Sequence, residues 1–176
     1  LGTFLNMIHG LVLGIAAILV MPGFLGMFTD EADMIHMGVQ YSEIVFLFSV
    51  PNAASLCFEK IFQAVGRMKT SMICMLVGCL TNIILDPLMI FGIGFFPAMG
   101  IRGAALATGI GQVTSLAMYL LFYYWKPIPV KVRISDMKPE TSLCKKVYSI
   151  GIPATLNLAL PSIQVSALNA ILTVFS

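Results

Sequence analysis

The residues best suited to chemistry lie in one apolar stretch, which runs from Ser71 to about Gly94. Small and polar residues follow one another there at intervals of four, namely Cys74, Gly78, Asn82 and Asp86. On a helix this spacing puts them on one face. If the helix crosses a membrane, an ionised carboxylate near its centre costs at least about 2.5–3.5 kcal/mol. Asp86 then needs either a proton or a bound cation.

Asp86 and Asn82 predict a site that exchanges H⁺ for a metal ion. Removal from water favours the neutral acid, whereas a bound cation favours the carboxylate. Pro87 has no N–H group, so the carbonyl of Ile83 loses its helical partner. That carbonyl, Asn82 Oδ1 and the Asp86 carboxylate would be hard oxygen ligands suited to Na⁺. The alternative is structural, with Asp86 at a kink near the outer interface and paired with Arg102.

The next apolar stretch offers a further ligand. Gly103, Ala107, Gly111 and Ser115 recur at intervals of four. Such a face of small residues allows two helices to approach closely. Thr108 and Gln112 lie on the neighbouring face. The Thr108 hydroxyl can supply an oxygen to the Asp86 site, or it can bond a carbonyl of its own helix.

Other polar residues are candidates for the lining of a water-filled cavity. They are Asn52, Glu59, Gln112, Asn157, Ser166 and Asn169. An interfacial helix end that faces lipid headgroups explains Glu59 equally well, and hydrogen bonds between helices explain Ser166 and Asn169. We expect His9, near Asn6, to be a packed histidine rather than a proton relay.

Composition determines the surroundings of these residues. Of 176 residues, 59% are apolar and 10% are charged, against about 25% charged in soluble domains. The mean hydropathy is +0.95. So little charge excludes a water-soluble globule, and so many large apolar residues exclude disorder. A net charge of +2 without a basic stripe argues against nucleic-acid binding. The predicted class is all-α, a polytopic helical membrane protein.

Five apolar segments approach the length of about 20 residues that crosses a bilayer. They cover Phe4–Phe28, Tyr41–Val65, Ser71–Gly94, Gly103–Trp125, and Val147 to the end. We expect a kink at Pro51 in the second segment. The chain begins at Leu1 and stops at Ser176 within an apolar run, so we expect it to be a piece of a longer protein.

Basic residues predict the orientation of these spans. Lys and Arg are concentrated on the cytoplasmic side of membrane proteins. The loops after the second and fourth spans, with the adjoining helix ends, carry nine of the ten Lys and Arg residues, and the loop after the third carries only Arg102. The basic loop Lys126–Lys146 is therefore cytoplasmic, and we expect a short amphipathic helix over Asp136–Lys146.

Two motifs carry a family resemblance. Asn82-x-x-x-Asp86-Pro87 is followed by Gly103-Ala104-Ala105-x-Ala107-Thr108 at a characteristic separation. Gly66-Arg67-Met68-Lys69 precedes them, and Gly151-Ile152-Pro153-Ala154 opens the last segment. With these motifs the chain resembles the multidrug and toxic compound extrusion (MATE) family.

The resemblance implies a protein with twelve helices in two lobes, of which this chain would hold the third to the seventh. Residues 1–125 would be four helices of the first lobe, 126–146 a basic linker between the lobes, and 147–176 the first helix of the second lobe. The family exports cationic or amphipathic compounds in exchange for H⁺ or Na⁺ by alternating access. A multi-pass location in a cell membrane follows, expected to be the bacterial inner membrane.

The resemblance also implies roles for particular residues. In some members a first-lobe cation site uses the residues that match Asn82, Asp86 and Thr108, together with an acid of the first helix. Other members use an acid in the seventh helix, where this chain has none and Pro161 stands near that place. This departure favours coupling in the first lobe. The implied partners are the lipid bilayer, small substrates and the remaining helices, with no cofactor beyond the coupling ion.

Three other interpretations compete with export. A lipid-linked saccharide flippase of the same superfamily would need a basic central cavity, and the segments contain almost no embedded Lys or Arg. A non-transporting membrane subunit would be encoded by a gene of only five spans. A membrane enzyme would need clustered His or acidic residues near an interface, and the sequence contains no such cluster.

The loop charges lead to a topology prediction. Single cysteines introduced at Asp33 and Lys138 of the full-length parent protein should be labelled by an impermeant maleimide from the outside and from the inside, respectively. The four natural cysteines are replaced by Ala beforehand as the control. Labelling of both positions from the same side would contradict the five-span topology.

Overall fold

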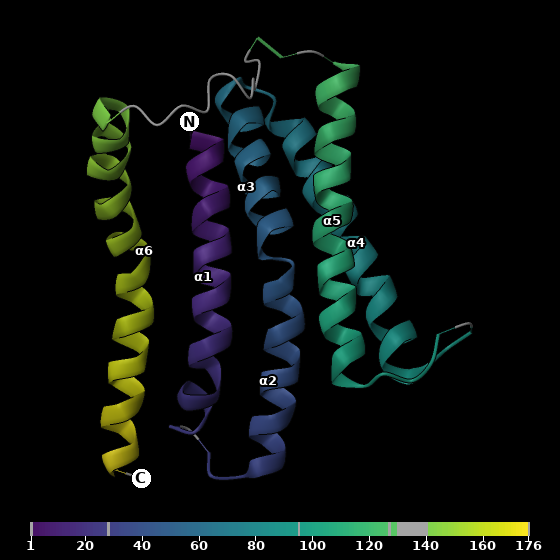
Figure 1. Cartoon of the computed structure of the whole chain (residues 1–176), viewed down its shortest axis with the longest axis vertical. Coiled ribbons are helices and arrows are strands. Elements are labelled where there is room, and N and C mark those ends of the chain that lie inside the picture. The colour runs from purple at the N-terminus through teal and green to yellow at the C-terminus, as the bar shows by residue number, and fades with distance from the viewer. Residues whose placement is uncertain (1, 28, 95, 127, 130–140, 176) are drawn as a thin grey trace. The chain divides into compact units, whose positions relative to one another are not determined.

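The computed structural model describes residues 2–27, 29–94, 96–126, 128–129 and 141–175. The regular structure in these residues is entirely helical, as Figure 1 shows. The helices are α1 (Gly2–Leu25), α2 (Ala32–Leu47), α3 (Ser49–Ala64), α4 (Met68–Phe91), α5 (Ile101–Trp125) and α6 (Thr141–Phe175). Residues 3–133 form one compact unit, and α6 belongs to a second unit, which is described by itself.

The apolar helices agree with four of the five predicted spans. Among the described residues, α1, α4 and α5 are each long and apolar enough to cross a membrane, and α2 with α3 would add a fourth crossing as one bent span. The fifth predicted span lies within α6, which begins at Thr141. The amphipathic helix expected over Asp136–Lys146 lies partly outside the described residues. The all-α membrane class is therefore confirmed.

The second predicted span needs correction, because it consists of two helices, the first of which begins earlier than Tyr41. α2 starts at Ala32, and α3 is bent from it by 51°. The break falls at Phe48 rather than at the predicted kink residue, Pro51. A proline ring clashes with the carbonyl four residues before it, here that of Leu47, so the helix breaks ahead of Pro51. The proline itself then lies in the first turn of α3, where it is tolerated.

Glycines bring the backbones of α4 and α5 into direct contact. A Cβ atom at Gly111 would lie 2.9 Å from the carbonyl oxygen of Gly78, and one at Gly103 would lie 2.5 Å from that of Met89. Gly103, Ala107 and Gly111 are all buried. The face of small residues predicted on α5 is therefore its contact face with α4.

The turn between these helices sets where α5 begins. Gly92 ends α4 with φ 71°, and Gly100 precedes α5 with φ 56°, a region that disfavours side chains. The amides of Met99 and Gly100 donate to the carbonyls of Met89 (3.0 Å) and Ile90 (3.2 Å). The chain thus returns along the end of α4 and starts α5 against it.

A core at the other end of α5 joins three helices. Its buried members are Phe58, Phe62, Cys74, Tyr119 and Ile128. The Tyr119 hydroxyl donates to the Ser71 carbonyl at 3.0 Å, and its ring lies 5.8 Å from that of Phe62 between centroids. This core holds α3 and α4 against the same helix.

A second close approach joins α1 to α3. A Cβ atom at Gly10 would lie 2.7 Å from Ala53 Cβ and 3.2 Å from the Ser49 carbonyl oxygen. The Asn6 side-chain amide donates to the Ala53 carbonyl, and Cys57 Sγ donates to Thr3 Oγ1 at 3.3 Å. Contacts along this pair therefore extend over several turns of α1.

The backbone contact at Gly103 yields a stability prediction. Gly103→Ala should lower the stability of the full-length parent by about 1–3 kcal/mol, since a methyl group there meets rigid backbone. Gly23→Ala in α1 is the matched control, because nothing lies within 4 Å of its added Cβ. Thermal unfolding in detergent measures both, and equal melting temperatures would contradict the close contact.

Candidate functional site

The structure brings the three predicted cation-site residues together. Asn82 Nδ2 donates to Asp86 Oδ1 at 3.3 Å and to Thr108 Oγ1 at 3.4 Å. The Thr108 hydroxyl in turn donates to the carbonyl of Ala104 at 3.0 Å. Both roles foreseen for Thr108 are thus compatible, because its hydroxyl bonds its own helix and still accepts from Asn82.

Local helix geometry and the glycine contact produce this arrangement. Asn82 and Asp86 stand one turn apart on α4, so they share a face. A Cβ atom at Gly111 would lie 3.1 Å from Asn82 Cβ, so α5 lies directly against that residue. Thr108 precedes Gly111 by less than a turn and therefore also faces α4.

The site offers an anionic carboxylate and two neutral groups. Its hydrogen bonds of 3.3 and 3.4 Å are longer than the usual 2.7–3.2 Å, so they are readily replaced. A half-turn of the Asn82 amide would present Oδ1 in place of its donor. Carboxylate, amide and hydroxyl oxygens then suit a hard cation, and the carboxylate can instead hold a proton.

Arg102 does not neutralise this carboxylate. Its Nε donates to Gln40 Oε1 at 3.0 Å, which joins α5 to α2. The ion pair between Asp86 and Arg102, which was the structural alternative for the acid, is not formed in the described part of the chain. The sequence carried no signal for Gln40 as the partner, since it lies outside the predicted spans.

Two pockets lie beside the predicted polar residues of α5. A pocket of about 250 Å³ is lined by Met75, Gly78, Cys79, Asn82, Thr108, Gly111, Gln112 and Ser115. A pocket of about 270 Å³ is lined by residues of α1, α2 and α3 and by Gln112, with the polar side chains of Asn6, His9, Ser49 and Asn52. The cavity-lining candidates Gln112 and Asn52 thus share the second pocket, and His9 Nδ1 lies 2.7 Å from the Leu5 carbonyl.

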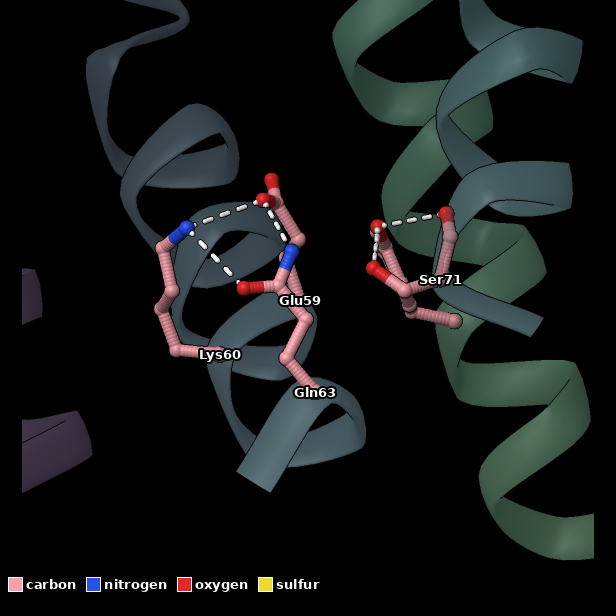
Figure 2. Close-up of polar contacts among 5 residues, drawn as sticks. Glu59, Lys60, Gln63 and Ser71 are labelled. Atoms are coloured by element: carbon pink, nitrogen blue, oxygen red, sulfur yellow. Dashed lines mark hydrogen bonds and ion pairs between the residues drawn. The ribbon is translucent and has the colours of Figure 1, made fainter. Parts of the chain in front are cut away.

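Glu59 lies in a different cluster. Its carboxylate accepts from Gln63 Nε2 at 2.8 Å and from Lys60 Nζ at 3.1 Å, and its side chain is only 16% exposed. Figure 2 shows these three side chains together on α3, with Ser71 and its hydrogen bonds apart from them. Glu59 lines a pocket of about 290 Å³ with Gln63, Met68, Lys69, Ser71, Met72 and Met75.

Three of the cavity-lining candidates lie in α6. Asn157 is exposed on α6, within the second unit of the chain. The side chains of Ser166 and Asn169 lie outside the described residues. The assignment of these three residues to a cavity lining remains a prediction. Ser49 was not predicted from the sequence as a site residue. It lines the α1–α3 pocket and contacts α1 at Gly10 and Gly14. Its position two residues before Pro51, the predicted kink, was the one feature of the sequence that pointed to it.

Comparison with known proteins identifies the family. The MatE family model matches residues 1–88, half of the chain. Multidrug export protein MepA of Staphylococcus aureus (strain bovine RF122 / ET3-1) is 30% identical over 151 residues, which cover 84% of this chain and 33% of that protein. MepA of Staphylococcus haemolyticus (strain JCSC1435) is 28% identical over 174 residues, covering 94% and 36%.

A solved structure shares the fold. The crystal structure of MATE in the bent conformation aligns with a TM-score of 0.79 and 22% identity, over 92% of this chain and 35% of that one. The chain spans about a third of the length of the curated relatives it matches. The polytopic helical fold and the family model together define a membrane transporter fold. This chain belongs to the MATE family.

Proposed function

We propose that this chain supplies part of a secondary active transporter that exports cationic or amphipathic compounds in exchange for H⁺ or Na⁺. The observation that carries the proposal is the meeting of Asn82, Asp86 and Thr108 between two apolar helices. Membership of the MATE family and relatives named multidrug export proteins support the direction of transport. Such a protein moves solutes and performs no covalent chemistry, so it is not an enzyme.

Residues 1–125 would supply four spans of the first lobe, 126–146 the linker between the lobes, and 147–176 the first span of the second lobe. The predicted orientation fits this division, since the basic loop would be cytoplasmic. The bacterial inner membrane is the location we propose. The remaining helices of the parent protein would complete the bundle around the exposed apolar faces, which α1 shows at Leu13 and Leu19.

Coupling would follow from the single charge at Asp86. A bound Na⁺ or proton neutralises the carboxylate and favours one arrangement of the lobe, whereas substrate favours another. The break at Phe48 and the missing helical bond at Pro87 are the places where α2–α3 and α4 can bend. Rocking around a site near the midplane suits transporters of this general kind.

Substrate class is tested by direct efflux. Cells that express the full-length parent should retain less of a fluorescent lipophilic cation than control cells, and should tolerate higher concentrations of it. A parent carrying Asp86→Asn is the matched control for expression without coupling. Unchanged efflux across a broad panel would contradict drug export and would move the assignment to the lipid-linked saccharide flippase.

Ion coupling is tested at Asp86. Asp86→Asn keeps the shape of the side chain but removes its charge, so the protein should insert normally while ion-driven efflux in proteoliposomes is abolished. A neutral amide cannot compensate a cation at low dielectric. Asn82→Ala and Thr108→Ala should each reduce efflux less, by about three- to tenfold, since each removes one neutral group.

Arg102→Ala is the control for these variants. It breaks the exposed contact with Gln40 and leaves the Asp86 cluster intact, so coupled efflux should stay near the wild-type rate. Wild-type coupling in Asp86→Asn would eliminate the site. Equal losses in Asp86→Asn and Arg102→Ala would instead restore the structural interpretation of the acid.

A further inference from the structure

Gln112 carries a buried polar atom that no hydrogen bond in the described part of the chain satisfies. Its side-chain oxygen Oε1 is inaccessible to solvent and has no partner there. A buried acceptor left unpaired costs free energy, and native proteins usually satisfy it with a water or an ion when no side chain does so. A Leu or Met would fill the same space without this cost. The amide oxygen therefore has an unused acceptor site.

The position of Gln112 indicates which ligand. It follows Thr108 by one turn of α5, so the two side chains share a face. It lines the pocket that contains Asn82 and Thr108 and also the pocket that contains Asn6, Ser49 and Asn52. Gln112 thus stands where the surroundings of the cation site meet the polar cavity between α5 and α1–α3.

The chemistry of the group is that of a neutral oxygen ligand. An amide oxygen accepts from water and coordinates hard cations, but it carries no charge and binds no proton. It can therefore stabilise a hydrated cation without competing with Asp86 for neutralisation. A water or hydrated ion held in a pocket needs two to four polar partners. Asn82, Thr108 and Gln112 are three such partners around one pocket.

We propose that Gln112 Oε1 is an additional ligand of the coupling cation, which it reaches when its side chain turns into the pocket that it shares with Asn82 and Thr108. This inference rests on the proposed function, because it needs the cation site at Asp86. It extends that site from α4–α5 into the α1–α3 cavity. Gln112 supplies no charge, so it would bind the ion without taking over the neutralisation that Asp86 provides.

The proposal predicts effects of opposite sign from one substitution. Gln112→Met keeps the length of the side chain and removes the unpaired oxygen. In the full-length parent without the cation, the melting temperature should stay equal or rise, because a buried unsatisfied acceptor is gone. The midpoint of the Na⁺-dependent rise in melting temperature should move to about three- to tenfold higher Na⁺, the effect of one lost neutral hydrogen bond.

The titration uses NaCl against choline chloride at constant ionic strength, so that Na⁺ alone is the probe. Thr114→Val is the matched control, because the Thr114 hydroxyl donates to the Ile110 carbonyl of its own helix at 2.8 Å. Gln112→Asn retains an amide that is shorter by one methylene, and its midpoint should lie between those of wild type and Gln112→Met. If Gln112→Met does not fold, this second variant carries the test.

The outcomes separate this inference from the proposed function. A wild-type midpoint in Gln112→Met and Gln112→Asn, with no Na⁺ response in Asp86→Asn, would overturn the role of Gln112 and leave the cation site standing. A lower melting temperature without Na⁺ and an unchanged midpoint would show a merely structural residue. A full Na⁺ response in Asp86→Asn would overturn both. A wild-type parent that responds to H⁺ and not to Na⁺ would also overturn the proposal, because an amide oxygen binds no proton.

Discussion

The direct backbone contact between α4 and α5 is the constraint on which the site depends. At Gly78, Gly103 and Gly111 the two helices approach so closely that an added Cβ would meet backbone atoms of the other helix. Asn82 lies beside Gly111, and its amide reaches Thr108 at 3.4 Å. A side chain at any of these glycines would push the helices apart and lengthen that contact beyond hydrogen-bonding range. The small residues therefore allow both the close packing of the helices and the hydrogen bond between Asn82 and Thr108.

α5 is the helix against which the others are arranged. It packs against α4 through glycines, against α3 through Tyr119 and Phe62, and against α2 through the Arg102–Gln40 hydrogen bond. At the break between α2 and α3, the ring of Phe48 lies where a side chain of Gly109 would be. The bend between α2 and α3 therefore contacts α5 directly. A movement of either helix would change the packing against α5, which carries Thr108 and Gln112.

Asp86 and Glu59 lie in different environments. The Asp86 cluster lies between α4 and α5, while Glu59 is bonded to Lys60 and Gln63 on α3. The carboxylate of Glu59 thus has a cation beside it, whereas Asp86 has only neutral partners in the described chain. In an apolar environment this difference decides which acid needs an external cation or a proton. It is the physical reason that Asp86, and not Glu59, is the proposed coupling residue.

The sequence by itself determined the helical membrane class and the alignment of Asn82 with Asp86, because composition and a spacing of four are local properties. It also determined the contact face of α5, since only a row of small residues permits such an approach. The tertiary structure alone decided that Thr108 faces Asn82, that Arg102 bonds Gln40, and that the second span breaks at Phe48. Those features depend on how helices distant in sequence are rotated and placed against one another, and spacing within one helix carries no information about that.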